Sequence, residues 1–244
     1  MKKTIIYQAI LAGCLTLAAC QPKNETTQNE AGQTESTDVT SRIADCKVTL
    51  GDVTFTHAIN GADTCVSLLA DRTLEFRCAE GLDFFCDPND GKLSNNTLPV
   101  LLIPTDNTKP FTLTAKVTPE FTAEGLYNAA DLFVYVNDTL WQKLAFEQDE
   151  YGNHRIVSVR TQGTSDDNNH DKIDAPSVYM KISSDTRTIA SYYSLDKKEW
   201  HMVRLYRNYY PDRIYLGISS QCPQRRIEEV TLSHDNVGDF RMGE

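Results

Sequence analysis

Residues 132–167, LFVYVNDTLWQKLAFEQDEYGNHRIVSVRTQGTSDD, contain the pattern that decides the fold class. Alternation of side-chain type and β-rich composition predict two strands, over residues 132–136 and 141–146, joined by a polar loop. A third strand is predicted over residues 155–161. Short consecutive strands of this kind are typical of an antiparallel sheet.

The middle strand has two chemically different faces. Because successive side chains point to opposite sides of a strand, Trp141, Lys143 and Glu147 share one face. Leu144 and Phe146 share the other face, which suits a packed core. A lysine and a glutamate would each be costly to bury without a partner. We therefore expect the charged face to line a groove on the side opposite to the core.

The two-residue period continues along the chain, in short β-branched and aromatic runs separated by Gly, Asn, Asp and Pro. This pattern predicts one all-β domain over residues 45–244, a sandwich or barrel of antiparallel strands and not a series of βαβ units. Further strands are expected at residues 46–55, 64–69, 74–78, 111–117, 178–183, 189–194, 200–206, 214–219 and 227–233.

The N-terminus has the features of an export signal. Two lysines precede an apolar run over residues 5–19, which is shorter than the roughly 20 residues of a transmembrane helix. Residues 17–20, LAAC, resemble the lipobox of bacterial lipoproteins, in which the signal is cut before a cysteine that is then acylated. The resemblance implies a signal peptide over residues 1–19 and a lipidated Cys20. An ordinary secretory signal with a chance cysteine is the alternative.

Such a protein is expected in the bacterial cell envelope, as a lipoprotein at the outer membrane or facing the periplasm, with the lipid anchor as its contact with the membrane. Residues 20–44 are polar and almost without large apolar side chains, which predicts a flexible tether. The formal net charge is −10, and no basic stripe is present. Nucleic acid is therefore excluded as a partner.

Loss of the signal peptide and lipidation of Cys20 would leave an odd number of cysteines, which can form at most two disulfides. If residues 65–69 and 74–78 form a hairpin, Cys65 and Cys78 lie opposite each other and make the best pair. Unpaired core cysteines are equally compatible with the sequence. No zinc-ligand spacing is present, so neither a metal nor a cofactor is expected. The cysteines concerned are Cys46, Cys65, Cys78, Cys86 and Cys222.

Several ordered motifs resemble one family. From residue 74 to residue 223 the chain is similar to a concanavalin A-like family of unknown function whose fungal members are named for regulation of enolase. The matching segments are FTLTAKV at 111–117, WQKLAFE at 141–147, SVRTQGTSDDN at 158–168, YSLD at 193–196 followed by Trp200, and GISSQCP at 217–223. Several motifs in order are more specific than any single one.

The resemblance implies a jelly-roll β-sandwich of two antiparallel sheets, related to legume lectins and laminarinase-type glucanases, without fixing an activity. Four positions depart from the family pattern. Asn128 replaces an expected Asp, which removes a possible acid or base at that position. The other three are Arg160 for Val, Lys198 for Gly and Cys222 for Ser.

Alternation on the predicted strand at residues 200–206 places Trp200 and Arg204 on one face, where they would join the groove of Trp141, Lys143 and Glu147. Indole rings and charged hydrogen-bonding groups suit a sugar, so carbohydrate is the expected partner, bound also through Ser165 and Asp166 of the S-D-D segment. The alternative is a structural charge network with both tryptophans packed.

Glu147 is the candidate catalytic residue if the chain hydrolyses glycosides. Laminarinase-type relatives carry E-x-D-x-E on one strand, but Tyr151 stands where the second Glu belongs. Glu150 would point the other way if the strand continued, which leaves a loop carboxylate such as Asp166 as a partner for Glu147. We therefore expect a lectin-like binding module first, a glycoside hydrolase second, and a structural or protein-binding sandwich third.

Residues 165–171, SDDNNHD, are rich in oxygen ligands, and a Ca²⁺-binding loop is one interpretation of this composition. The segment lacks the spacing and the glycine of an EF-hand loop. Asx turns explain the composition of such a segment without a metal, so it is expected to be a polar loop.

Overall fold

The computed structural model describes residues 42–69, 73–123, 125–224, 230–233 and 241–242 of the 244-residue chain. The expected signal peptide, Cys20 and nearly all of the expected tether lie outside these residues. The described residues contain no helix long and apolar enough to span a membrane.

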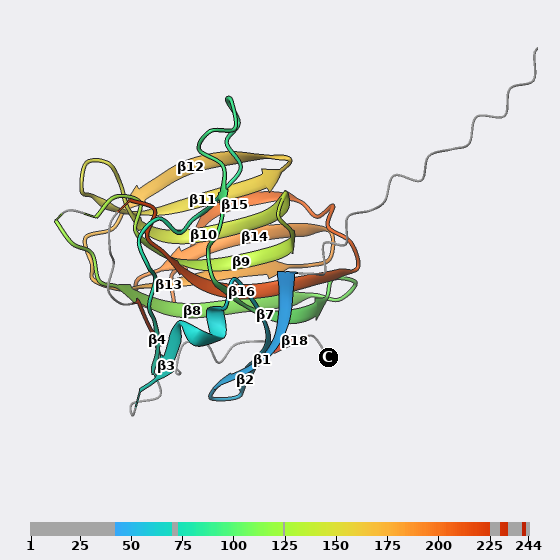
Figure 1. Ribbon diagram of the computed structural model, residues 1–244. Coiled ribbons are helices and arrows are strands. Elements are labelled where there is room, and N and C mark those ends of the chain that lie inside the picture. The colour runs from blue at the N-terminus through green and yellow to red at the C-terminus, as the bar shows by residue number, and fades with distance from the viewer. Residues whose placement is uncertain (1–41, 70–72, 124, 225–229, 234–240, 243–244) are drawn as a thin grey trace, which may run out of the picture. The chain divides into compact units, whose positions relative to one another are not determined.

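Two large antiparallel sheets form the domain, which confirms the all-β jelly-roll sandwich (Figure 1). Sheet A has the strand order β1 (Ile43–Leu50), β2 (Val53–Ile59), β7 (Val100–Asp106), β16 (Arg213–Gln221), β9 (Ala129–Asn137), β10 (Leu140–Gln148), β11 (His154–Gln162) and β12 (Thr164–Lys172). Sheet B has the order β15 (His201–Arg207), β14 (Thr188–Ser194), β13 (Val178–Ser184), β8 (Phe111–Pro119), β17 (Val230–Ser233), β4 (Thr73–Phe76) and β3 (Val66–Leu68), and β18 (Arg241–Met242) also pairs with β8.

The main core lies between the two sheets. Leu144 and Phe146 of β10 are fully buried there, as are Leu113 of β8 and Met180 of β13. This confirms the predicted inward face of β10. Strand β10 is central within sheet A, paired with β9 on one side and with β11 on the other. The outward face of β10 is therefore presented by a rigid, fully paired strand.

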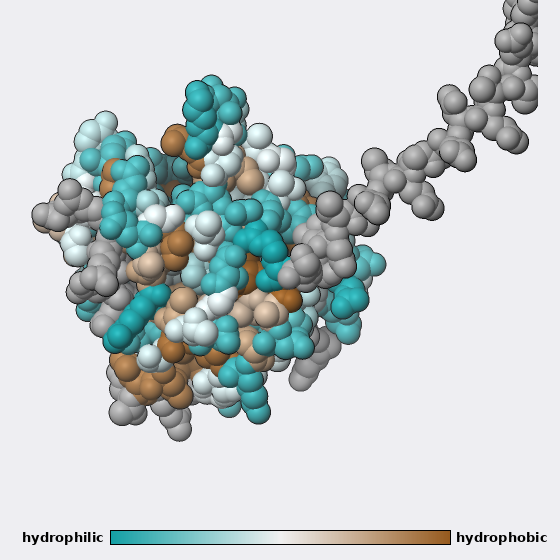
Figure 2. Space-filling model, viewed as in Figure 1, coloured by the Kyte–Doolittle hydropathy of each residue, from teal (hydrophilic) through white to brown (hydrophobic). Residues whose placement is uncertain are grey.

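A second apolar cluster lies on the outer face of sheet A. The long connection between β4 and β7 crosses this face and contains the short strands β5 (Phe84–Phe85) and β6 (Asn95–Asn96). We call residues 77–99 the covering loop. Phe84 is buried against Trp141, Tyr135 and Phe133 of β9 and β10. The tip of the loop forms the hydrophilic projection at the top of the view in Figure 2.

The strand assignment differs from the expectation in three places. Residues 46–55 form two strands, because Gly51, with φ of 60°, makes the turn between β1 and β2. Residues 165–171 belong to edge strand β12 and not to a polar loop, since the β11 ladder supplies hydrogen bonds that outweigh the low β propensity of Asp and Asn. Strand β7 was not expected at all, although it lies inside sheet A.

The proposed pairing of Cys65 with Cys78 also fails. The β3–β4 register places Val66 opposite Phe76, so Cys65 is level with Arg77 and not with Cys78. Cys65 is half-buried and Cys78 is buried, and neither is in a disulfide. Burial raises the pKa of the Cys78 thiol well above its ordinary value. Its thiol is therefore an apolar core group under ordinary conditions.

Candidate functional site

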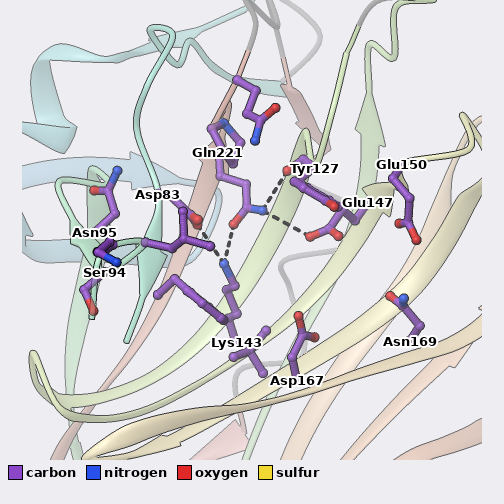
Figure 3. A pocket seen from close by; sticks show the side chains of 16 residues that line it. Asp83, Ser94, Asn95, Tyr127, Lys143, Glu147, Glu150, Asp167, Asn169 and Gln221 are labelled. Atoms are coloured by element: carbon purple, nitrogen blue, oxygen red, sulfur yellow. Dashed lines mark hydrogen bonds and ion pairs between the residues drawn. The ribbon is translucent and has the colours of Figure 1, made fainter. Parts of the chain in front are cut away.

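A pocket of about 550 Å³ opens on the outer face of sheet A, between the covering loop and strands β10, β12 and β16. The register across the sheet explains the hollow. Glu147 of β10 is opposite Ala129 of β9, which is in turn opposite Gln221 of β16. The next β10 side chain on the same face as Glu147 is Ala145. These small side chains leave room above the sheet, and larger polar groups surround it (Figure 3).

Lys143 is the centre of the pocket's hydrogen-bond network. Its side chain is 3% exposed, and its Nζ donates to Asp83 Oδ1 at 3.0 Å and to the Phe84 carbonyl at 3.0 Å. A third bond, of 2.6 Å, goes to Gln221 Oε1. Burial opposes the charged ammonium, but the neighbouring carboxyl groups, Asp83 first, outweigh this effect and raise the pKa of Lys143 above its ordinary value. Lys143 is therefore a fully paired buried cation.

Gln221 connects the lysine to the glutamate. While its Oε1 accepts from Lys143, its Nε2 donates to Glu147 Oε2 at 3.1 Å and to the Tyr127 carbonyl at 2.7 Å. These three bonds fix the orientation of the amide (Figure 3). The carboxyl group of Glu147 is consequently held in place at the pocket wall.

Two carboxyl groups of the pocket, Glu147 and Asp167, and one beneath it, Asp131, retain protons more readily than ordinary ones. Burial raises the pKa of Glu147 well above its usual value, with Lys143 acting in the opposite direction and Asp167 adding to the increase. Burial also raises the pKa of Asp167. Asp131 of β9, opposite Ala145, is fully buried, and burial raises its pKa to about 7. Near neutral pH, Asp131 can therefore donate as well as accept hydrogen bonds.

Gln221 and Asp167 were not predicted as site residues. Both lie inside segments that carried the family resemblance, residues 217–223 and 158–168. Asp167 lines the pocket because it is opposite Val159, which is opposite Lys143. The sequence analysis names Asp166 and not Asp167, because side chains of a loop over residues 165–171 would not alternate between two faces. Recognising β12 as a strand would have identified Asp167.

Trp141 projects on the same face as Lys143, as expected, but it is not accessible to a ligand. Its side chain is fully buried beneath Phe84, with ring centroids 5.2 Å apart at a near-perpendicular angle. The indole N–H donates to the Asp138 carbonyl at 3.1 Å. Trp141 therefore supports the covering loop, and the expectation that it stacks on a sugar is corrected.

Trp200 and Arg204 do not join the pocket either. Trp200 immediately precedes β15 in sheet B and stacks against Lys181, whose Nζ lies 3.8 Å from the ring centroid. Arg204 Nε donates to Ser158 Oγ at 2.9 Å, and its Nη1 pairs with Asp166 at 3.1 Å. Ser158 is opposite Leu144, so these contacts lie on the inner side of sheet A. The expectation of one shared groove was wrong for these residues. They belong to or adjoin sheet B, which packs against the inner side of sheet A, whereas the pocket lies on the outer side.

Ser165 fastens the covering loop to the sheet. Its Oγ accepts from the Cys86 backbone N–H at 2.9 Å, and its own backbone N–H donates to the Cys86 carbonyl at 2.8 Å. The Thr161 hydroxyl lies 2.8 Å from the Ser165 Oγ. The structure thus places Ser165 beside the pocket, as a group that positions the loop bearing Asp83.

Glu150 reaches the pocket by a turn. Strand β10 ends at Gln148, and Asp149 accepts backbone hydrogen bonds from Tyr151 and Asn153. This turn directs Glu150 to the pocket rim, whereas Tyr151 is exposed. Among the described residues, no three His, Cys, Asp or Glu side chains converge as metal ligands.

Fold and site together define a concanavalin A-like sandwich with a polar pocket on one sheet. The chain belongs to the family described as "Protein of unknown function (DUF1349)", which matches residues 63–238. No match was found among curated proteins.

Solved structures share the fold. A functionally unknown protein from Saccharomyces cerevisiae has a TM-score of 0.64 and 24% identity, over 72% of this chain and 91% of the other. A xylan beta-1,4-xylosidase from Bacillus halodurans C-125 has a TM-score of 0.56 and 13% identity, over 87% of this chain and 40% of the other. The GH43 protein BlXynB from Bacillus licheniformis has a TM-score of 0.54 and 18% identity, over 79% and 38%. This chain thus spans only about two fifths of the xylosidase and of BlXynB.

Proposed function

We propose that this chain is a lectin-like module that binds carbohydrate in the pocket of sheet A. The observation that carries the proposal is the Lys143–Gln221–Glu147 network, held rigidly at the wall of a cavity of about 550 Å³. Sugar recognition needs fixed donors and acceptors around a concave site of this size. The pocket supplies carboxyl and amide groups, held in place by the buried Lys143 on a paired sheet. Fold similarity to a xylosidase agrees with this assignment by analogy.

The Glu147→Gln variant is expected to weaken glycan binding by about 10- to 100-fold. A hydrogen bond between a ligand hydroxyl and an ionised or strongly polar carboxyl group is worth about 1.5–3 kcal/mol, and the amide cannot reproduce it. A glycan array identifies the ligand, and titration calorimetry of its best hit measures the change. Glu199→Gln, at an exposed position before β15, is the matched control. The proposal fails if no glycan binds the wild type, or if Glu147→Gln binds the glycan as tightly as the Glu199→Gln control.

A second candidate function is glycoside hydrolysis. It is favoured by one observation, namely that Glu147 and Asp167 both line the pocket and both have raised pKa values, as a general acid requires. Reducing-sugar release from the array hits, measured for wild type and Glu147→Gln, separates the two functions. Release that the substitution abolishes identifies an enzyme, whereas binding without release identifies a binding module.

We further propose that the module is exported and held at the cell envelope by a lipid on Cys20. When the full chain is expressed in a bacterial host, wild type is expected in the membrane fraction. Cys20→Ala is expected to lose metabolic labelling with palmitate and to leave that fraction. Cys14→Ala, within the signal segment, is the matched control and is expected to behave as wild type. Membrane retention of Cys20→Ala without label would show that the anchor is elsewhere.

A further inference from the structure

The pocket is lined by four carboxyl groups but only two lysines, Lys143 and Lys92, and Lys92 is paired with Asp90 outside the lining. Lys143 forms an ion pair with Asp83, at 3.0 Å. Glu147, Glu150 and Asp167 also line the pocket, and none of them forms an ion pair with another described residue. Glu147 is buried, and Glu150 and Asp167 are exposed at the edge of the pocket. Carboxyl groups gathered around one cavity disfavour each other's ionised forms, so a positive group between them would be stabilised.

A further carboxyl group lies beneath this set. Asp131 projects from β9 on the same face as Lys143 and Glu147, because it is paired with Ala145, which lies between them on β10. It is fully buried, and neither of its side-chain oxygens has a hydrogen-bond partner in the described structure. A buried polar group of this kind calls for an explanation, and an incoming cation above it would supply one.

The shape of the cavity indicates the kind of cation. Glu147 comes from β10, Asp167 from β12 and Glu150 from the turn after β10, so the acidic groups occupy different walls (Figure 3). A volume of about 550 Å³ is that of a small-molecule site. Hydrogen-bonding groups between the carboxyl groups, such as Gln221 and Asn169, suit the hydroxyls of a sugar ring. The complement is an organic ligand that carries both hydroxyl groups and a positive charge.

We propose that the pocket selects carbohydrates that carry a free protonated amine, that is, amino sugars, over neutral sugars of the same shape. The proposal rests on the carbohydrate-binding function above and specifies its ligand class. The ammonium group binds among Glu147, Glu150 and Asp167, on the side of the pocket away from the Asp83–Lys143 pair.

Proton release should accompany this binding. The groups that face Glu147 and Asp167 are Asp83 from the covering loop, Asp131 from β9, Lys143 from β10, Tyr127, Glu150 at the rim, and Arg204 on the inner side. Because burial raises the pKa values of Glu147 and Asp167, these groups hold their protons more strongly in the empty pocket than ordinary carboxyl groups do. A cation favours the ionised form, so the affinity for a charged amine increases as the pH rises through the raised pKa values of these carboxyl groups. The amine of an amino sugar has a pKa no higher than that of an α-amino group, so binding is compared at pH 6, where the amine is still charged.

The test compares two ligands that differ in one group, a β-1,4-linked glucosamine oligosaccharide and its fully N-acetylated counterpart. Titration calorimetry at pH 6, in two buffers of different ionisation enthalpy, gives both affinity and protons released. The amine form is expected to bind about tenfold or more tightly, which corresponds to about 1.4 kcal/mol, and to release protons. The acetylated form should release none.

The outcomes separate the two proposals. Equal affinity of the two forms, or exclusive binding of a neutral glycan from the array, overturns the amine preference and leaves carbohydrate binding intact. Failure of every glycan overturns both. Asp167→Asn is expected to weaken binding of the amine form about tenfold more than binding of the acetylated form, and Asp52→Asn, in the exposed β1–β2 turn, is the matched control that should change neither. Retention of the full preference in Asp167→Asn would also contradict the assignment.

Discussion

The Lys143→Met variant is expected to destabilise the domain by about 3–5 kcal/mol, because removing one partner of a buried ion pair leaves the other uncompensated. Asp83, the Phe84 carbonyl and Gln221 Oε1 would all lose their shared donor. Methionine has nearly the volume of the lysine stem, so the loss reports on charge and hydrogen bonding more than on packing.

Chemical denaturation with urea measures this change. Lys47→Met, at an exposed position of β1, is the matched control and is expected to shift stability by less than about 0.5 kcal/mol. A loss below about 1 kcal/mol for Lys143→Met would mean that the network is not held as tightly as its burial indicates.

The Phe84→Ala variant is the second change with a large expected effect, a loss of about 3–5 kcal/mol. Phe84 is fully buried, and its ring contacts Trp141, Tyr135 and Phe133 with centroid distances of 5.2, 5.9 and 6.1 Å. Its removal leaves a cavity under the covering loop, which also carries Asp83. We therefore expect weaker glycan binding together with lower stability.

Two measurements distinguish loop release from a general loss of stability. Denaturation gives the free energy of unfolding. Acrylamide quenching of tryptophan fluorescence in the folded state, measured in a Trp200→Phe background, reports exposure of Trp141. Phe85→Ala is the neighbouring control, because Phe85 is only partly buried and should cost less. Equal effects of the two substitutions, or unchanged quenching in Phe84→Ala, would refute the role of Phe84 as the anchor of the loop.

The sequence was sufficient to predict the faces of β10. Strand alternation alone separated Leu144 and Phe146, which fill the core, from Lys143 and Glu147, which line the pocket. The prediction succeeded because β10 is a regular central strand, paired along its whole length with β11. The register of such a strand is strongly specified, since a shift of one residue would bury Lys143 and Glu147 in the core.

The remaining parts of the site depend on contacts between distant segments. The covering loop, which supplies Asp83 and buries Trp141, comes from residues far from β10 in sequence, and no local pattern assigns it to that face. Arg204 has the correct alternation on its own strand, but alternation does not specify which sheet the strand joins. Asp167 was missed because an Asp- and Asn-rich strand contradicts β propensity, and only pairing with β11 stabilises it.

The most direct test of the central claim is a two-dimensional ¹H–¹⁵N NMR titration with the tightest-binding oligosaccharide from the array. If the pocket of sheet A is the binding site, saturable shifts should occur at the Gln221 side-chain amide and at the backbone amides of Lys143, Glu147 and Asp167. The indole signal of Trp200, which precedes β15 in sheet B, should stay unchanged. Saturable binding that shifts the Trp200 signal and leaves the Gln221 amide unperturbed would contradict the account and place the ligand elsewhere on the sandwich.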